Sequence, residues 1–450
     1  MKITTTPKEK LQLFFKIMLP ILVTQLGMFA MTFFDTVMTG NYSSGDLAGV
    51  AIGSSIWLPV YTGLTGILIA TTPIVAQLVG AKKGKHVANS VIQGSYLSII
   101  LSLIVLIVGY FVLNPLLNGM SLEPHVQQVA HDYLVALSFG IIPLFLFSVL
   151  RSFIDALGQT RVSMIITLLA LPINVLFNYM LIFGKFGLPE LGGVGSGVAT
   201  SITYWIIVII SILVVIQLKP FTNYHVYQKL HPFSAKECWN FLKIGVPIGL
   251  SIFFETSIFS AVTLLMSSYD TITIASHQAA MNFSSFLYMM PLSISMAVTI
   301  VVGFEVGAKR YQDAKQYSFI GTIIAVSMSL LFCIVLYFFR TEIAGIYSND
   351  PEVINLAAHF LIYALFFQLS DAIMAPIQGA LRGYKDVNIT FVMTLFSFWM
   401  IGLPTGFVLA NDTSLGAYGY WIGLIIGLAI GAICLLLRLL FIQKRKFTYQ

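Results

Sequence analysis

The strongest constraint on this chain is a series of apolar runs, each long enough to cross a lipid bilayer. A membrane-spanning helix needs about 20 predominantly apolar residues, and runs of that length follow one another along the whole sequence. The runs are continuous rather than alternating, which favours helices over the tilted strands of an outer-membrane barrel. The sequence therefore predicts an all-α polytopic membrane protein with twelve transmembrane helices, at residues 14–38, 50–78, 90–112, 129–151, 163–183, 194–217, 240–267, 275–304, 318–338, 354–379, 388–410 and 416–440.

The composition and the distribution of charge agree with a membrane-embedded chain. Of the 450 residues, 58% are hydrophobic and only 9% are charged, whereas a soluble surface needs roughly a quarter of its residues charged. With twelve spans, the Lys and Arg residues of the loops and termini fall on one face of the membrane, except for Lys185 and Arg340. The positive-inside rule then predicts that both termini are cytoplasmic. The net charge of +6 follows from this topology, so it does not indicate a nucleic-acid partner.

An internal repeat divides the chain into two halves. Adding 227 to residue numbers of the first half maps Pro20 onto Pro247 and the segment 79–83 (VGAKK) onto 306–310 (VGAKR). A smaller offset of 225 aligns Gly158 with Gly383. Because each half has six spans, both halves enter the membrane from the same side, as a parallel repeat. We expect an N-lobe at 1–218, a cytoplasmic linker at 219–239 that serves as a tether, and a C-lobe at 240–450.

Three isolated carboxylates lie inside the predicted spans, where ionisable groups are costly and usually functional. Asp35 lies in span 1, Glu255 in the middle of span 7 and Asp371 in span 10. An acid at this depth implies water access, a bound cation or a bound proton. Under the 227 offset Asp35 aligns with Val262 and Glu255 with Met28, so the two halves share architecture but not ionisable groups. We therefore expect different chemical roles for the acids of the two halves.

Polar residues of spans 5 and 6 are the expected partners of Asp35. Asn174 and Asn178 are spaced i, i+4, so both amides face one direction on their helix, just after Pro172. With Thr200 they would form an oxygen-rich site for a small cation or would hold a protonated acid. The alternative is a structural hydrogen-bond network that joins spans 1, 5 and 6.

Other polar residues near the spans are open to two interpretations. Arg151 and Asp155 are spaced i, i+4, which indicates a local ion pair. His277 and Gln278 begin span 8, where they would serve either in gating or substrate binding or as a satisfied helix end. The three cysteines, Cys238, Cys333 and Cys434, have no paired spacing and are expected to be apolar packing residues.

The sequence contains no motif that predicts nucleotide chemistry. The string GGVGSG at 192–197 precedes a membrane span rather than following a soluble strand, so helix entry and close packing explain it better than dinucleotide binding. The string GAKKGKH has the wrong spacing for a phosphate-binding loop, and His86 stands where Ser or Thr is required. We therefore expect no ATPase, no other enzyme activity and no cofactor besides a coupling ion.

Several segments together resemble the multidrug and toxic compound extrusion (MATE) family, in its NorM-like bacterial branch. They are the repeated VGAKK and VGAKR, the stretch that runs from ASHQAAMNF to VGFEVGAKR, the pair FQLSDA and GALRGYKD, and the acids Asp35, Glu255 and Asp371. The resemblance covers essentially the whole chain. It implies two six-helix lobes around a central V-shaped cleft, and export of amphipathic organic cations from a bacterial cytoplasmic membrane in exchange for Na⁺ or H⁺.

The resemblance also implies roles for individual residues. Asp35, Asn174, Asn178 and Thr200 match an ion or proton site of the N-lobe, whereas Glu255 and Asp371 match a cation site of the C-lobe that would bind Na⁺. Phe367 stands one turn before Asp371, where NorM-like relatives often carry a tyrosine, and the lost hydroxyl puts purely sodium-coupled transport in doubt. The residues that we expect along the substrate cleft are Gln25, Met28, Phe259, His277, Gln278 and Phe367.

Two other functions are compatible with a polytopic helical protein. A lipid-linked sugar flippase of the same superfamily predicts several arginines in the cavity, but only Arg151 and Arg438 fall plausibly within spans. An integral-membrane transferase predicts a catalytic constellation at a membrane face, and no loop offers one. We expect a monomeric antiporter whose partners are small amphipathic cations and the bilayer.

Overall fold

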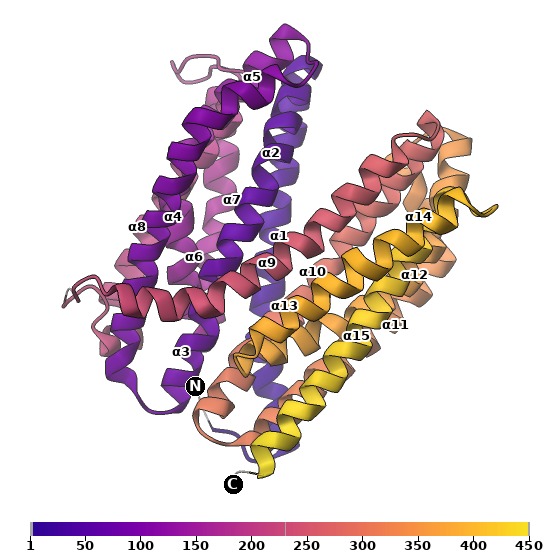
Figure 1. The fold of residues 1–450 in the computed structure, drawn as a ribbon. Coiled ribbons are helices and arrows are strands. Elements are labelled where there is room, and N and C mark those ends of the chain that lie inside the picture. The colour runs from indigo at the N-terminus through magenta and orange to yellow at the C-terminus, as the bar shows by residue number, and fades with distance from the viewer. Residues whose placement is uncertain (1–2, 230, 449–450) are drawn as a thin grey trace. The chain divides into compact units, whose positions relative to one another are not determined.

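The computed structural model describes residues 3–229 and 231–448, which fold into helices joined by short turns (Figure 1). The first half of the chain contains α1 (Pro7–Tyr42), α2 (Ser44–Leu68), α3 (Thr71–Gly80), α4 (Gly84–Asn118), α5 (Pro124–Ser138), α6 (Ile141–Ala156), α7 (Thr160–Ile182) and α8 (Gly193–Gln217). A short helix η1 (Phe221–Tyr224) follows, and then α9 (Ala235–Met266), α10 (Thr271–Gly307), α11 (Tyr311–Tyr347), α12 (Pro351–Gly383), α13 (Val387–Leu395), η2 (Phe396–Gly402), α14 (Leu403–Asn411) and α15 (Ala417–Thr448). The predicted all-α polytopic fold is confirmed.

The membrane-length helices correspond one to one with the predicted spans. Among the described residues, eleven helical stretches are long and apolar enough to cross a membrane, or up to twelve if the bent pair α5 and α6 is one span. The two helices of this pair meet at 51°, within the predicted span 129–151. Gly140 lies at the bend, and a Cβ atom there would be 2.9 Å from Cα of Ser201, so the glycine allows α8 to pack against the bend.

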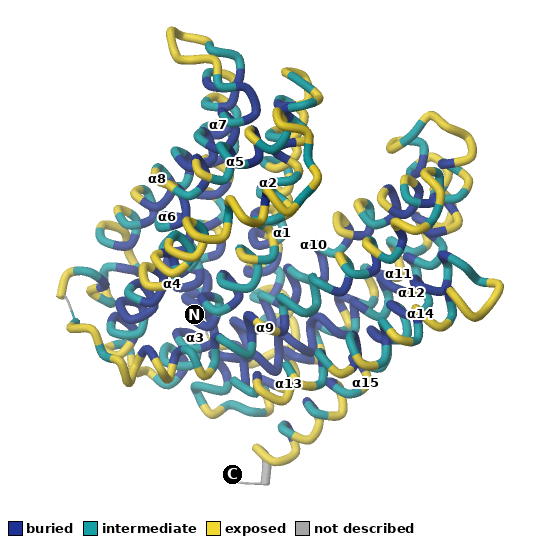
Figure 2. The backbone as a smooth tube through the Cα atoms, turned by 45° about the horizontal axis from the view of Figure 1, so that its top comes forward, coloured by how far each residue is buried: buried dark blue, intermediate teal, exposed yellow. Residues whose placement is uncertain are grey.

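The chain forms two compact units whose boundaries follow the repeat. One unit comprises Met1–Leu22 and Leu250–Gln450, and the other comprises Val23–Gly249; Leu22 and Gly249 are 227 residues apart, as the repeat requires. Each unit therefore contains the first half of a helix whose second half belongs to the other unit. Figure 2 shows that buried residues alternate with intermediate and exposed ones along the helices of each unit.

The exchanged half-helices are buried in the units that receive them. In the first unit, Phe14 and Ile17 of α1 are fully buried in the apolar core formed with α10, α11 and α12. In the second unit, α9 packs against α2 so closely that a Cβ atom on Gly245 would lie 2.5 Å from the carbonyl oxygen of Ile67. The division of the chain into lobes at 218 and 240 stays a prediction.

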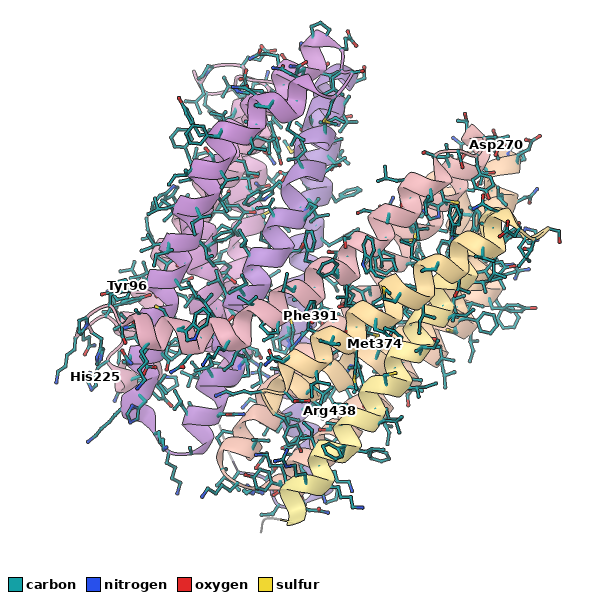
Figure 3. All side chains as sticks on the ribbon, viewed as in Figure 1. Tyr96, His225, Asp270, Met374, Phe391 and Arg438 are labelled. Atoms are coloured by element: carbon teal, nitrogen blue, oxygen red, sulfur yellow. The ribbon has the colours of Figure 1, made fainter. Side chains whose placement is uncertain are left out.

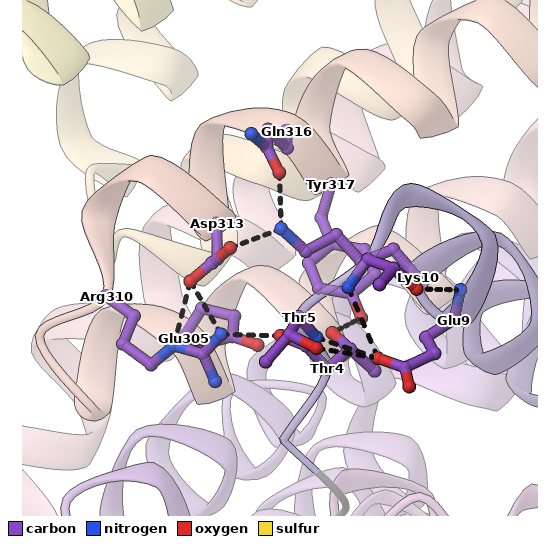
Figure 4. A network of polar contacts seen from close by, with 10 residues as sticks. Thr4, Thr5, Glu9, Lys10, Glu305, Arg310, Asp313, Gln316 and Tyr317 are labelled. Carbon is purple, nitrogen blue, oxygen red and sulfur yellow. Dashed lines mark hydrogen bonds and ion pairs between the residues drawn. The ribbon is translucent and has the colours of Figure 1, made fainter.

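Polar contacts fix the start of α1 and the segment before it to α11 and to Arg310 at the N-cap of α11 (Figure 4). Thr4 Oγ1 lies 2.8 Å from the hydroxyl of Tyr317, and Arg310 Nη2 donates to the carbonyl oxygen of Thr4 at 2.7 Å. Lys10 is buried and its ammonium donates to Asp313 and to Gln316. The N-terminal end of α1 is thus held by charge as well as by apolar packing.

The connection between the halves is packed against the second unit rather than extended. Tyr96 of α4 donates to the carbonyl oxygen of His231 at 3.0 Å, and Gln93 Nε2 donates to that of Pro232 at 2.8 Å. Ser95 lies 2.6 Å from the hydroxyl of Tyr227, and Phe221 is fully buried. Figure 3 labels Tyr96 and His225 in this region. The sequence indicated only a tether, because hydropathy does not reveal such contacts.

Four turns share one backbone conformation, and their positions show that a single offset of 227 residues relates the two halves of the chain. The residue after each helix C-cap is left-handed, with φ of 57° at Lys82, 75° at Gly158, 60° at Lys309 and 60° at Lys385. Lys82 and Lys309 differ by 227, and so do Gly158 and Lys385. The alignment of Gly158 with Gly383 at an offset of 225 was therefore wrong. Gly383 is the last residue of α12, where a Cβ atom would lie 2.9 Å from Val302.

Small residues allow α14 and α15 to approach closely. A Cβ atom on Gly423 would lie 2.4 Å from Cα of Gly406, which is the close backbone approach that spaced glycines permit between membrane helices. Between α13 and α14 the helix widens into the π-helix η2. Trp399 of η2 donates to the carbonyl oxygen of Phe254 at 3.0 Å, so this distortion is in contact with α9 next to Glu255.

Candidate functional site

Asp35 and its expected partners from α7 and α8 form a continuous hydrogen-bonded cluster. Asn178 Nδ2 donates to Asp35 Oδ1 at 2.5 Å and to Asn174 Oδ1 at 3.0 Å. Asn174 Nδ2 donates to Thr200 Oγ1 at 3.3 Å, and the Thr200 hydroxyl donates to Asp35 Oδ2 at 3.5 Å. The structure thus brings all four side chains together inside the second unit.

The helices that carry this cluster explain why it forms. Asn174 and Asn178 are one turn apart on α7, so their amides point the same way, and both side chains are fully buried. The Oδ1 atom of Asn178 is buried and has no hydrogen-bond partner among the described residues. Neutral donors therefore hold the Asp35 carboxylate, while a free acceptor oxygen lies beside it.

Glu255 and Asp371 both lie in the first unit, Glu255 on α9 and Asp371 on α12. Gln378 Nε2 donates to Glu255 Oε1 at 3.5 Å. Asp371 is two turns earlier on the same helix, is only 4% exposed and has an Oδ2 atom without a hydrogen-bond partner among the described residues. Across residues 3–229 and 231–448, no Lys or Arg lies within ion-pair distance of Asp35, Glu255 or Asp371.

The sequence missed two residues of this C-terminal site. Arg382, which hydropathy placed in a loop after a span ending at 379, lies in the last turn of α12 and is only 8% exposed. It is one turn after Gln378 and within Coulombic range of Glu255. Tyr288 of α10 is within Coulombic range of Glu255, Asp371 and Arg382. The spacing of seven and eleven residues from Asp371 to Gln378 and Arg382 was the available signal, because it puts all three on one helix face.

With Arg382 counted, the C-terminal site carries a net charge of about −1 when both acids are ionised. Glu255 and Asp371 contribute two negative charges, and Arg382 contributes one positive charge. Among the residues that the structure describes, no three His, Cys, Asp or Glu side chains gather where a metal ion could bind. The site is thus suited in charge to one monovalent cation.

The residues expected along a substrate cleft have different surroundings. Gln25 and Met28 are half-buried and both contact Arg151, whose Nη2 atom lies 3.4 Å from Gln25 Oε1. Phe259 packs edge-on against Phe367, with ring centroids 5.6 Å apart. The cleft assignment itself stays a prediction.

His277 and Gln278 are consecutive residues of α10, but their side chains have different surroundings. His277 is 0% exposed, accepts from Trp421 Nε1 at Nδ1 over 3.2 Å, and has Nε2 3.2 Å from the Thr263 hydroxyl. Gln278 is exposed. Both ring nitrogens of His277 thus have hydrogen-bond partners within the protein. These contacts favour a structural role over a role in gating or substrate binding.

Arg151 and Asp155 form the expected local ion pair. Nε of Arg151 lies 3.6 Å from Oδ2 of Asp155, and Asp155 also accepts from the hydroxyl of Ser163 on α7. The pair therefore joins α6 to α7. Together with Gln25 and Met28 it also connects α6 to the second half of α1.

The family model described as MatE matches this chain twice, at residues 20–180 and 247–408. The two matches begin 227 residues apart, as the repeat does, and together they cover more than half of the chain. The chain belongs to the MATE family. The transferase alternative was wrong, because this is a family of membrane transporters.

Full-length relatives and solved structures agree with this MATE assignment. The "Probable multidrug resistance protein NorM" of Bacillus cereus is 58% identical over 450 residues, which are 100% of this chain and 99% of that protein. The protein of the same description from Bacillus subtilis is 57% identical over 445 residues, 99% of this chain and 98% of that protein.

Two solved MATE structures share the fold. The eukaryotic MATE transporter AtDTX14 matches with a TM-score of 0.84 at 21% identity, covering 97% of this chain and 98% of that chain. An outward-facing multidrug resistance MATE family transporter of the MOP superfamily matches with a TM-score of 0.87 at 17% identity, covering 99% and 100%. This MATE protein is therefore a multi-pass membrane transporter with the fold of its family.

Proposed function

We propose that this protein is a secondary active antiporter that exports amphipathic, mainly cationic drugs from the cytoplasm in exchange for Na⁺ or H⁺ by alternating access. The observation that carries the proposal is that three membrane-embedded acids are held by neutral hydrogen-bond donors or left partly unpaired, rather than locked to lysine or arginine. The MATE family membership and the multidrug resistance names of the NorM relatives support the substrate class.

The chemistry of the acids explains how binding becomes coupling. A carboxylate can be neutralised by Na⁺, by a proton or by a nearby organic cation, and these states compete with one another. A ligand shifts a conformational equilibrium only by its difference in affinity for the two conformations. Competition at Asp35, Glu255 and Asp371 therefore links release of the drug to uptake of the ion, as a coupling free energy between binding events.

The substrate class follows from apolar and aromatic side chains near the acids. Phe367 lies one turn before Asp371 on α12, and its ring contacts that of Phe259 on α9. Met28 lies two turns before Asp35 on α1. Aromatic faces attract organic cations, and methionine adapts its shape to different ligands. We infer loose selectivity for lipophilic cations rather than for one fixed substrate.

The same proposal includes the topology and assembly of the protein. Both termini lie in the cytoplasm, and the basic turns at 82–83 and 309–310 face the cytoplasm. The protein acts as a monomer in a bacterial cytoplasmic membrane. Residues 1–218 and 240–450 form the two lobes, and 219–239 connect them. The Lys and Arg asymmetry of the sequence supports the orientation.

Transport assays in everted vesicles test the proposal. Ethidium or norfloxacin export is measured under imposed Na⁺ and pH gradients, for the wild type and for Glu255→Gln and Asp371→Asn. Each variant should lose at least about 90% of gradient-driven export, because an amide cannot exchange a proton or neutralise a cation. Glu342→Gln, at an exposed acid of α11, is the matched control and should export normally.

Two results contradict the proposal. The first is a correctly inserted wild-type protein that exports no cationic dye under either gradient. The second is normal coupled export by both Glu255→Gln and Asp371→Asn, which would show that these acids are not the coupling groups.

A further inference from the structure

A groove opens on the surface of the second unit between α5 and α8, two helices that pack against each other (Figure 1). Its volume of about 520 Å³ is in the range of small-molecule sites. Its lining side chains come from one face of each helix and include Asp132, Val135, Phe139, Val194, Val198 and Trp205. On α8, a membrane-length helix, the same face continues with the exposed residues Ile209 and Leu213. The groove therefore opens toward lipid.

Side chains of α8 hold the end of α5 next to its bend at Gly140. The last turn of a helix leaves carbonyl oxygens without partners in the helix. Ser201 donates to the carbonyl oxygen of Ala136 at 2.7 Å, and Trp205 Nε1 donates to that of Phe139 at 2.9 Å. The groove is thus held in shape by hydrogen bonds, and its walls are mostly apolar.

The groove is about as long as one leaflet of the bilayer is thick. Val194 lies in the first turn of α8 and Trp205 near its middle, eleven residues later. Eleven residues of helix cover about 16 Å, and half of the hydrocarbon core is about 15 Å. A Cβ atom on Gly197 would lie 2.9 Å from the carbonyl oxygen of Tyr133, which places Asp132 level with the first turn of α8. Asp132 is therefore at the headgroup end of the groove.

Asp132 is a fourth acid within a predicted span, at 129–151. Its side chain is 42% exposed. The carboxylate accepts from Gln128 Nε2 at 2.8 Å and lies 3.0 Å from His131 Nδ1, both on its own helix. Across residues 3–229 and 231–448, no Lys or Arg lies within ion-pair distance of it. An acid in a membrane span is costly and usually serves a function, and this one faces a groove that opens toward lipid.

We propose that the groove between α5 and α8 binds one phosphatidylethanolamine molecule, with an acyl chain along α8 and the headgroup ammonium on Asp132. With the orientation proposed above, this lipid belongs to the outer leaflet. A primary ammonium donates N–H bonds to a carboxylate, and such charge-assisted bonds are roughly twice as strong as neutral ones. The quaternary ammonium of phosphatidylcholine has no N–H group, and phosphatidylglycerol has no cation. Both should therefore bind more weakly.

Native mass spectrometry tests the assignment, because the added mass identifies each bound lipid. The full-length protein is delipidated in detergent and titrated with an equimolar mixture of phosphatidylethanolamine, phosphatidylcholine and phosphatidylglycerol. The wild type should bind phosphatidylethanolamine about tenfold more tightly than phosphatidylcholine, which corresponds to about 1.4 kcal/mol. Asp132→Asn should lose this preference and keep its affinity for phosphatidylcholine. Asp412→Asn, at an exposed acid outside the groove, is the matched control and should keep the preference.

A second variant tests the groove while the acid is retained. Val198→Phe places a ring among the lining side chains and leaves Asp132 unchanged, so it should also lose the bound phosphatidylethanolamine. Tm is measured with and without this lipid, since a ligand that binds the folded state stabilises it according to its affinity. Asp132→Asn should have the wild-type Tm without lipid and a smaller lipid-induced increase.

Equal affinities of the wild type for phosphatidylethanolamine and phosphatidylcholine would overturn the assignment, because the groove would then hold only ordinary surrounding lipid. Wild-type binding of phosphatidylethanolamine by Asp132→Asn would overturn it as well. Saturable binding of ethidium that depends on Asp132, without selective lipid binding, would assign the groove to a drug instead. Failure of dye export under both gradients would leave the lipid preference intact, so the lipid site and the antiport are tested separately.

Discussion

Asn178 holds the Asp35 carboxylate with an amide rather than with a charge. Its Nδ2 group donates to both Asp35 and Asn174, so one side chain orients the acid and fixes its neighbour. A hydrogen bond to a charged group contributes about 1.5–3 kcal/mol. Such a donor stabilises the ionised carboxylate enough to let a proton or cation leave, but it does not neutralise the carboxylate permanently.

Replacing Asn178 tests this role. Asn178→Ala removes the donor to Asp35, so the acid should retain its proton more strongly, and the pH profile of dye export should move about 1–2 pH units to the alkaline side, as expected from a lost bond of that strength. Initial export rates between pH 6 and pH 9 provide the measurement. Asn411→Ala, at an exposed amide that donates to the carbonyl oxygen of Phe407 in its own helix, should leave the profile unchanged. An unshifted profile in Asn178→Ala would contradict the role of the amide.

Sequence patterns predicted site residues only where a short spacing along one helix puts their side chains on the same face. Asn174 and Asn178 were found because two amides one turn apart in an apolar span are unusual. Arg382 was missed because its charge ends the apolar run at 379, although α12 continues to Gly383 and buries the side chain. Tyr288 resembled any aromatic residue of a membrane helix, because its surroundings depend on how closely α10 packs on α12.

The packing of α10 on α12 depends on Gly379. The carbonyl oxygens of Ser295 and Gly379 both accept from Thr299, so the two backbones share one hydroxyl. A Cβ atom at 379 would meet backbone rather than the end of a flexible side chain. The contact therefore leaves no room for a larger residue unless one of the helices moves.

Alanine substitutions distinguish this contact from the general effect of glycine in helices. Gly379→Ala should lower the stability by about 3 kcal/mol, at the upper end of the usual cost of overpacking. In Gly109→Ala the new Cβ atom meets nothing within 4 Å on α4, so this variant should gain up to about 1 kcal/mol. Thermal unfolding in detergent gives both values. Equal stabilities of the two variants would show that α10 and α12 separate at little cost.

The turns that follow α3, α6, α10 and α12 show that a comparison of residue types does not always align equivalent backbone positions. Three lysines and one glycine adopt the same left-handed conformation, at Lys82, Gly158, Lys309 and Lys385. An L-residue in this conformation costs roughly 1–2 kcal/mol, but the turn pairs the last carbonyl groups of the preceding helix. Matching the glycine letters gave the wrong offset because the backbone shape is retained while the residue type is not.

At the scale of the molecule, the topology can be tested by labelling. Lys82→Cys and Lys185→Cys introduce thiols at two exposed positions on opposite predicted faces of the membrane. A membrane-impermeant maleimide should label Lys185→Cys in intact cells and Lys82→Cys only after permeabilisation. The wild type gives the background labelling of its own cysteines, of which Cys238 is buried and Cys333 and Cys434 are half-buried. The reverse pattern would invert the orientation and place the termini outside.

The exchange of half-helices between the compact units has a consequence for biosynthesis. The start of α1 is synthesised before α11, yet Asp313 of α11, the ion-pair partner of the buried Lys10, lies 303 residues later in the chain. Similarly, the groove that α2 offers to Gly245 and Gly249 stays uncovered until α9 has left the ribosome. Neither repeat can therefore mature on its own during translation, because the start of α1 meets its final neighbours only after α11 has been synthesised.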